Sequence, residues 1–218
     1  MRYIVLCGAV LFAFTASAQS VDFGVHGNFL NLNIPAEITE FAGVTTPTNV
    51  EALALKEVYG IGYGGGIHLI IGTPILSIRI SGDYSTLTPN NDKFKSYLRT
   101  IIGPLAENAS VEGGRITVIA GDANLKFTFL PLPVVKPYLT GGIGLGNVKA
   151  DDVKITLGNQ TFSDALLKNQ TVMTLNGGVG VDLAFGGVAV YGEVRVVAFF
   201  LEPKTATYLP IGTVGITF

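Results

Sequence analysis

The chain has 218 residues, of which 28 are glycine, 48% are hydrophobic and only 14% are charged, and its net charge is −2. Disordered chains combine low hydrophobicity with high net charge, so this composition excludes disorder. The 14 Lys and Arg residues are scattered along the chain, which argues against nucleic acid as a partner.

The first 18 residues have the pattern of a secretory signal peptide. Arg2 provides a positive charge, residues 4–14 are apolar, and Ala16-Ser17-Ala18 supplies the small residues that precede a cleavage site. We expect cleavage after Ala18, which leaves one domain of residues 19–218 (218 − 18 = 200 residues). The single cysteine, Cys7, is lost with the signal peptide. The mature protein is therefore predicted to be exported and to fold without disulfides.

Eight segments of the remaining chain alternate between apolar and polar residues with a period of two. Most are about 10 residues long, the length of a strand that crosses a bilayer, and none has the ~18 consecutive apolar residues of a membrane helix. The segments cover residues 22–29, 59–71, 76–85, 119–129, 138–146, 173–185, 188–196 and 213–218. This pattern predicts an all-β protein, an eight-stranded antiparallel up-and-down transmembrane barrel of the outer-membrane type.

The connections between these segments alternate between short and long. Tight turns with the expected Gly and Pro residues are predicted at residues 72–74, 130–133 and 185–187. Long loops are predicted at residues 33–58, 87–114, 149–170 and 199–207. Outer-membrane barrels have short turns on the periplasmic side and long loops outside, so we expect both termini on the periplasmic side.

With this topology the outward aromatic residues gather at two levels. The periplasmic level contains Phe23, Phe127, Phe129, Phe185 and Phe218, and the outer level contains Tyr59, Tyr63, Tyr84 and Tyr208. Aromatic girdles of this kind flank the apolar band of a membrane barrel.

The apolar faces carry no charge in the central segments, whereas the opposite faces carry charged residues among glycines. A soluble barrel such as a lipocalin alternates in the same way but exposes its polar face to water. The glycines at positions 60, 62, 64 and 66 suit the crowded interior of a narrow barrel better than a polar exterior. We therefore expect the charged faces inside and outer-membrane lipids, including lipopolysaccharide, around the apolar faces.

The inward-facing charges are expected to form a network that fills the lumen. Its expected members are Arg79, Asp83, Asp122, Lys126, Asp182, Glu193, Arg195 and His68. Unpaired charges would be costly there, whereas paired and hydrogen-bonded charges are tolerated. Counting back from the turns places His68 opposite Arg79 and Lys126 opposite Tyr138.

These features leave two functions open. An eight-stranded barrel has an interior that side chains roughly fill, which favours a structural or surface-interaction role. The alternative is a narrow pore for small solutes or ions. Such a pore would favour cations, because the four acidic residues of the network and Asp22 outnumber its three basic residues.

Catalysis is not expected. The two histidines, His26 and His68, are predicted to face the lumen, and the sequence has no Gly-x-Ser-x-Gly, HExxH or P-loop motif. We expect no cofactor or metal, since the mature chain lacks cysteine and its histidines lie on separate strands.

Two loop segments have patterns of their own. One has the helical spacing of Phe94, Tyr97, Leu98, Ile101, Ile102 and Leu105, flanked by Lys93, Lys95 and Arg99. This predicts a short amphipathic helix at the outer membrane interface or over the barrel mouth. In the other, residues 153–157 precede Gly158-Asn159 and predict a β-hairpin. Because loops often carry function, the loops are the predicted functional surface for any extracellular partner, but neither segment identifies a ligand.

The sequence resembles the small eight-stranded outer-membrane barrel proteins, which include the transmembrane barrel of OmpA and the OmpX-like and opacity-type proteins. The most specific segments are KPYLTGGIGLG at residues 136–146 and LPIGTVGITF at residues 209–218. The resemblance implies that the barrel assembly machinery reads the last strand, with Val214, Ile216 and Phe218 facing outward. It also implies a location in the outer membrane of a Gram-negative-type bacterium.

Overall fold

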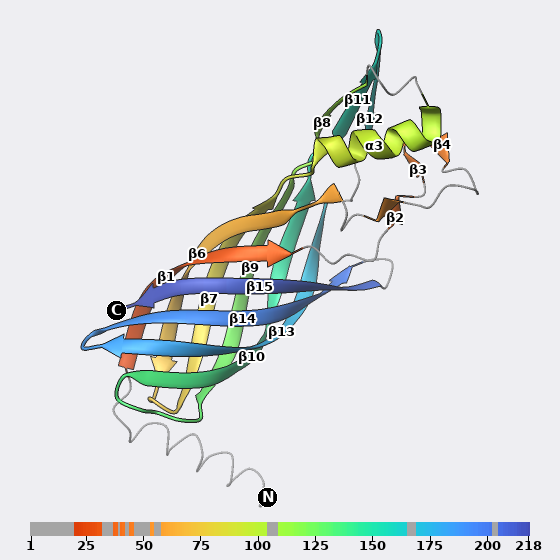
Figure 1. Ribbon diagram of the computed structural model, residues 1–218. Helices are drawn as coiled ribbons and strands as arrows, with labels where there is room; N and C mark the ends of the chain where they lie inside the picture. Colours follow the sequence, from red (N-terminus) through yellow and green to blue (C-terminus); the bar gives the residue numbers. More distant parts are fainter. Residues whose placement is uncertain are drawn as a thin grey trace, which may run out of the picture.

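The computed structural model of the protein describes residues 20–31, 37–38, 40–41, 44–45, 53–54, 58–103, 109–164, 169–201 and 205–218. Eight long strands form a closed antiparallel barrel, and shorter elements lie beyond one of its ends (Figure 1). The barrel strands are β1 (Ser20–Asn31), β6 (Ile61–Gly72), β7 (Leu76–Leu87), β9 (Ile116–Thr128), β10 (Val135–Ala150), β13 (Gln170–Phe185), β14 (Val188–Leu201) and β15 (Thr205–Thr217). Their order is β1-β15-β14-β13-β10-β9-β7-β6, which confirms the predicted up-and-down barrel.

The three short turns lie at the end of the barrel where β1 begins and β15 ends, which we name the turn end. The opposite end is the loop end (Figure 1). At the turn end, Phe218 N donates to Phe23 O at 2.7 Å and Phe23 N donates to Phe218 O at 3.2 Å, so the first and last strands are joined. Gly186, in the two-residue turn between β13 and β14, has a φ of 66°, which glycine adopts without strain. The expected signal peptide lies outside the described residues.

Several strands extend further toward the loop end than the alternation predicts. Most of the loop expected at residues 199–207 is strand, because β14 continues to Leu201 and pairs there with Thr205 of β15. The prediction of a loop here was wrong because the strands stay paired beyond the last residues that alternate between apolar and polar. Backbone hydrogen bonds between strands do not require alternating side chains.

Two hairpins have a register displaced by two residues from the expected one. His68 pairs with Ser81 instead of Arg79, and Lys126 pairs with Thr140 instead of Tyr138. Both connections are longer than the counting assumed. A shift of two residues keeps every side chain on its face, so the assignment of faces is unaffected.

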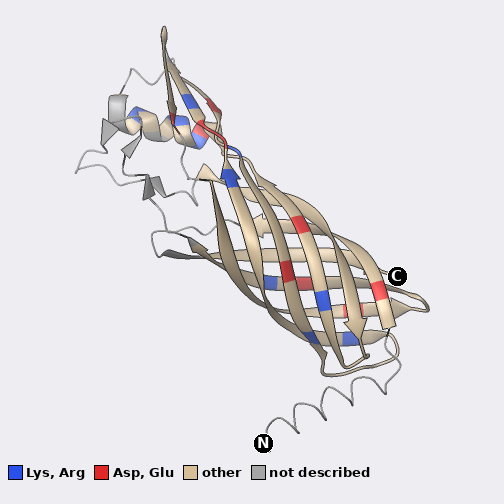
Figure 2. Cartoon of the chain, turned by 180° about the vertical axis from the view of Figure 1, so that it is seen from behind, with Lys and Arg blue, Asp and Glu red and all other residues tan. Residues whose placement is uncertain are grey.

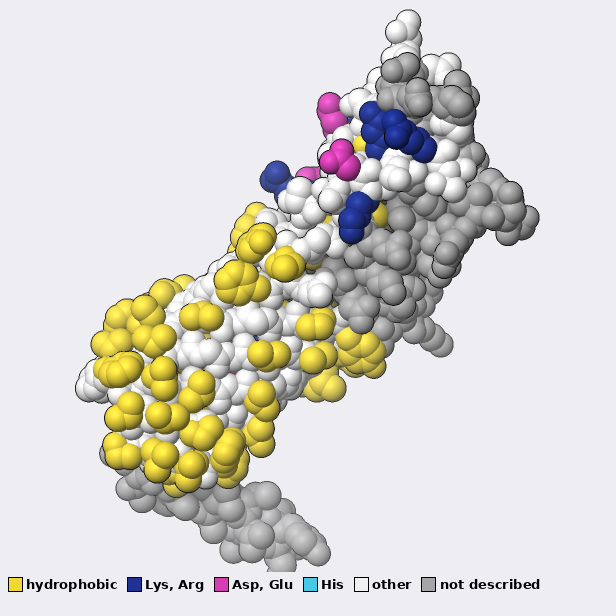
Figure 3. All heavy atoms as spheres, in the orientation of Figure 1, with side chains coloured by type: hydrophobic (Ala, Val, Ile, Leu, Met, Phe, Trp, Pro, Cys, Tyr) yellow, Lys and Arg dark blue, Asp and Glu magenta, His cyan; other side chains and the backbone are white. Residues whose placement is uncertain are grey.

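The barrel is apolar outside and its interior is polar toward the turn end, the reverse of a soluble barrel. Figure 3 shows hydrophobic side chains over the barrel wall and charged side chains concentrated beyond the loop end. Inside, Arg79, Lys126 and Glu193 are buried. So much exposed apolar surface is not compatible with a lipocalin-like barrel in water. No helix in the described part of the chain is long and apolar enough to cross a membrane.

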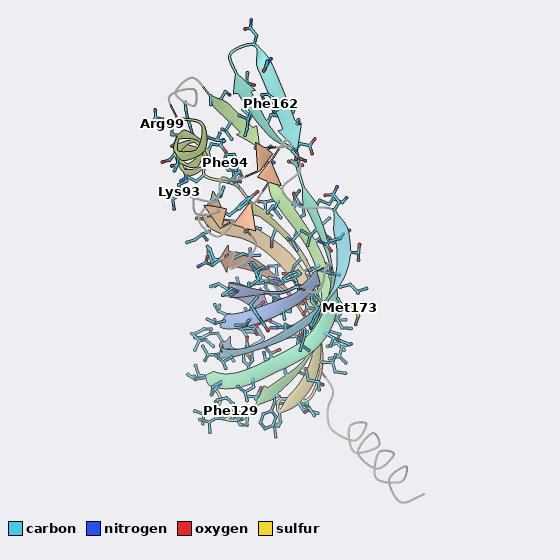
Figure 4. The ribbon with its side chains drawn as sticks, turned by 90° about the vertical axis from the view of Figure 1, so that its right-hand side faces the viewer. Lys93, Phe94, Arg99, Phe129, Phe162 and Met173 are labelled. Atoms are coloured by element: carbon cyan, nitrogen blue, oxygen red, sulfur yellow. The ribbon has the colours of Figure 1, made fainter. Side chains whose placement is uncertain are left out.

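The outward aromatic residues follow the prediction with one exception. The exposed members are Phe23, Phe127, Phe129, Phe185, Phe218, Tyr63, Tyr84 and Tyr208, with Phe129 at the turn end (Figure 4). Tyr59 is buried instead, and its hydroxyl donates to Gly114 O at 2.5 Å. Its assignment to the outer girdle was wrong, because Tyr59 precedes β6 and bridges to Pro89. Burial raises the pKa of Tyr59, so the hydroxyl stays protonated and can donate.

Shorter elements lie beyond the loop end of the barrel (Figure 1). They are α3 (Asn91–Ile102), the three-stranded sheet of β8 (Ser110–Gly113), β11 (Val153–Leu157) and β12 (Gln160–Asp164), and two small sheets that pair β2 (Glu37–Ile38) with β5 (Leu53–Ala54) and β3 (Glu40–Phe41) with β4 (Val44–Thr45). Both the predicted helix and the predicted hairpin at Gly158-Asn159 are confirmed.

Capping and packing explain how α3 is held. Asn90 caps its N-terminus, since the Asn90 side chain accepts from the backbone N–H groups of Asp92 and Lys93. Phe94 faces the barrel axis and joins the buried apolar cluster, whereas Lys93 and Arg99 point away (Figure 4).

Glycines on the inner face make room for large side chains from neighbouring strands. The fully buried Tyr138 ring lies against Gly180, its pairing partner on β13. A Cβ at position 180 would collide with this ring and approach Gly192 O to 2.8 Å.

We expect Gly180→Val to lower the free energy of unfolding by about 1–3 kcal/mol, because the ring and the backbone must move apart. Gly192→Val is the matched control, since it adds the same side chain to the neighbouring strand with nothing within 4 Å of its Cβ. Urea unfolding of residues 19–218 in detergent micelles compares the two. Equal losses in both variants would contradict the role of Gly180.

Candidate functional site

Barrel strands carry charged residues along their length (Figure 2). Charged side chains from four of these strands meet inside the barrel. Arg79 of β7 and Glu193 of β14 form a bidentate ion pair, with Nη1–Oε2 and Nη2–Oε1 distances of 2.8 Å. In the closed order of eight strands, β7 and β14 are four positions apart, which places them on opposite sides of the barrel. The pair therefore crosses the lumen.

Glu193 is shared by two guanidinium groups. Arg195 Nε lies 3.0 Å from Glu193 Oε1, and Arg195 Nη1 donates to Asp122 Oδ1 at 3.3 Å. Asn124 also donates to Asp122. The Glu193 side chain is 0% exposed, so its charge is compensated by these cations and not by bulk water.

A second ion pair lies closer to the turn end. Lys126 Nζ donates to both carboxylate oxygens of Asp182, at 2.9 and 2.7 Å. The same Nζ lies 4.0 Å from the centroid of the Tyr138 ring, a cation–π distance. The buried Lys126 ammonium group is thus stabilised by the Tyr138 ring as well as by the Asp182 carboxylate.

The two histidines connect β1, β6 and β7. His26 Nε2 lies 2.7 Å from Asp83 Oδ1, and Asn28 donates to the same oxygen at 2.5 Å. The Nδ1 atoms of His26 and His68 are 3.2 Å apart, and His68 Nε2 lies 3.0 Å from the Thr217 hydroxyl. The result is a polar chain from Asp83 to β15.

The structure places every residue of the expected lumen network inside the barrel. Six of them, Arg79, Asp122, Lys126, Asp182, Glu193 and Arg195, lie in ion pairs, and Asp83 contacts His26 and Asn28. His68 contributes hydrogen bonds only. Asp22 stays apart at the turn end, where it accepts from Ser20.

Several neutral partners of the network were not identified from the sequence. They are Asn28, Asn124, Tyr138, Tyr191, Thr213 and Thr217. All lie in the inward-facing phase of their strands, which is the signal that could have found them.

Toward the loop end the interior changes from polar to apolar. The inward residues there are Leu30, Val118, Val197, Phe199, Leu209 and Ile211, which belong to the same buried cluster as Phe94 of α3. A cavity of about 30 Å³ lies where the two zones meet, with Arg195 and Asp83 in its polar lining and Phe199 in its apolar lining. It has room for about two water molecules.

Two other predicted features can be located. Val214, Ile216 and Phe218 are exposed on the outer face of β15 and after its end. Within the described ranges, no three His, Cys, Asp or Glu side chains gather in a way that could hold a metal ion.

Comparison with known proteins gives a match at the level of structure only. No family model and no curated protein matches the sequence. The crystal structure of Neisserial surface protein A (NspA) aligns with a TM-score of 0.51 at 13% identity, covering 92% of this chain and 98% of that one. A major outer membrane protein from Thermus thermophilus aligns at 0.48 and 12%, covering 91% and 98%. Ail of Yersinia pestis aligns at 0.41 and 10%, covering 92% and 97%.

At 13% identity the likeness to NspA concerns the fold alone. It agrees with the closed barrel of eight antiparallel strands and its apolar outer surface. The chain therefore has the fold of the small eight-stranded outer-membrane β-barrels.

Proposed function

We propose that this protein is an outer-membrane barrel with a closed lumen and a structural or surface-interaction role. The observation that carries the proposal is the Arg79–Glu193 ion pair, which spans the interior between strands on opposite sides of the barrel. Arg195 and Asp122 extend this bridge along a third strand.

The energetics of these ion pairs favour a plug over a pore. Their side chains are 13% exposed or less. A water path through the barrel would have to separate these pairs, one of which connects strands on opposite sides of the lumen. We therefore rank a conduit for small solutes or ions below a closed barrel.

The remaining assignments follow from this proposal. The signal peptide is removed after Ala18, lipids including lipopolysaccharide surround the apolar wall, and the barrel assembly machinery recognises β15 through Val214, Ile216 and Phe218. The protein is not an enzyme. The loop end, which exposes Lys93 and Arg99 of α3, is the surface for an extracellular partner.

Single-channel recording tests the proposal directly. We expect residues 19–218, refolded and inserted into a planar bilayer, to give no conductance steps in about 1 M KCl. Insertion is verified separately by heat-dependent gel migration and by protection of the barrel from protease. Reproducible steps that scale with salt would overturn the closed lumen and favour the conduit.

A further inference from the structure

The three-stranded sheet beyond the loop end has one unpaired edge. Its strand order is β12-β11-β8, and β8 lies against α3. Within the described residues β12 pairs with β11 alone, and all five of its residues are exposed. The outer edge of β12 therefore carries backbone N–H and C=O groups that a further strand can bind.

One face of this sheet carries an apolar row that ends at the unpaired edge. Ile155 of β11 pairs with Val111 of β8 on one side and with Phe162 of β12 on the other, so the three side chains are neighbours. Ile155 is 3% exposed, and Val111 packs against the buried cluster that includes Phe94 of α3. Phe162, the last member of the row on the projecting sheet, is 38% exposed (Figure 4). The row is thus covered at its centre and open at β12.

The backbone of β12 fixes how a further strand can pair with it. The hairpin turn between β11 and β12 has two residues, so the Leu157–Gln160 pair next to the turn is hydrogen-bonded. By the alternation of an antiparallel ladder, Phe162 then directs its N–H and C=O toward β11. Thr161 and Ser163 direct theirs toward the unpaired edge.

The sequence of β12, QTFSD, is complementary to itself in an antiparallel pairing centred on Phe162. Phe162 then lies opposite its own copy, and aromatic pairs of this kind stabilise a sheet. Thr161 lies opposite Ser163, where both the hydroxyl groups and the edge backbone groups can hydrogen-bond. Gln160 lies opposite Asp164, so an amide donor faces a carboxylate and no like charges meet. A second copy of the same strand therefore fits this edge.

We propose that β12 pairs antiparallel with β12 of a second copy of this protein that lies in a facing membrane. β11 and β12 project away from the loop end of the barrel (Figure 1). Because antiparallel strands point in opposite directions, the two barrels lie on opposite sides of the joined sheet. The two sheets become one sheet of six strands, and the two apolar rows meet at Phe162.

This proposal rests on the surface-interaction role proposed above and names the partner. A pair of five-residue strands is a small contact, so a single copy binds weakly. Many copies on each membrane act together, and multivalent contacts of this kind raise the overall affinity by about 10²–10⁴.

Disulfide formation tests this register directly, because residues 19–218 contain no cysteine. Gln160→Cys and Asp164→Cys variants are refolded separately, with one barrel in each phosphatidylcholine nanodisc, and the two kinds of disc are mixed under mild oxidation. In the proposed pairing, positions 160 and 164 of two copies lie opposite each other. Two copies of position 160 are about 14 Å apart, beyond the ~7 Å Cα separation that a disulfide can span. Discs that carry Gln160→Cys alone are therefore the matched control.

We expect the mixed discs to form linked pairs at least about tenfold faster than the control discs. Adding Phe162→Ser to both variants should slow the linking to the control rate. Adding Phe200→Ser, which removes an exposed phenylalanine from the barrel wall, should leave it unchanged.

Equal rates in mixed and control discs would overturn the proposal, and this is the result expected if β12 binds an extended segment of a different protein. Linking that occurs only when both variants share one disc would exclude the pairing between facing membranes. Heat-dependent gel migration of each variant verifies that its barrel is folded. A failure of the pairing is thereby separated from a failure of the closed barrel, which conductance measures.

Discussion

Replacing Glu193 by glutamine is expected to lower the free energy of unfolding by about 3–5 kcal/mol. Glu193 is the carboxylate that Arg79 and Arg195 share, and its side chain is 0% exposed. Glutamine preserves the shape but removes the charge, so the buried Arg79 guanidinium would lose its carboxylate partner and Arg195 would keep only Asp122. Urea titration of residues 19–218 in detergent micelles, followed by circular dichroism, measures the loss.

Asp22→Asn is the matched control for this change, because it removes a carboxylate from the same barrel without touching the ion pairs. Asp22 is partly exposed and contacts Ser20, so we expect a change within about 0.5 kcal/mol. A Glu193→Gln variant as stable as Asp22→Asn would contradict the buried network as a stabilising unit.

Opening the lumen is the second large effect that we expect. The triple variant Arg79→Ser, Glu193→Ser, Arg195→Ser removes the side chains that bridge β7 and β14, in a barrel whose interior is filled only by side chains. It should give discrete conductance steps in a planar bilayer where the native protein is silent. The current should be carried mainly by cations, because three aspartates would then face Lys126 alone.

Three substitutions outside the lumen provide the comparison. Lys93→Ser, Lys95→Ser and Arg99→Ser remove three charged side chains from α3 and should leave the bilayer silent. If the folded lumen variant is silent as well, the apolar zone around Phe199 and not the ion-pair network closes the barrel.

The barrel and its faces could be predicted because a membrane imposes them on the sequence. A lipid-facing wall requires an apolar residue at every second position, and this period survives in all eight strands. The helix at Phe94 was predictable for the same kind of reason, since its apolar residues recur at helical spacing.

What could not be predicted depends on contacts between distant strands. Which carboxylate meets Arg79 depends on barrel order and register, and an error of two residues in a turn already changes the pairing partners. Tyr59 was misplaced because its contacts are with the distant residues Pro89 and Gly114. The apolar part of the lumen at the loop end was not predicted, because the inner face was expected to be polar throughout. Val197 and Phe199 nevertheless continue the inward phase of Arg195 along β14.

The joining of β1 to β15 has a consequence for how the molecule forms. Gly24 pairs with Thr217, so the contact that closes the sheet links residues from the two extremes of the described chain. Such long-range contacts carry a high loop-closure entropy and slow folding. Until β15 pairs with it, β1 therefore holds an open edge, and an unpaired edge strand is a template for pairing with another molecule.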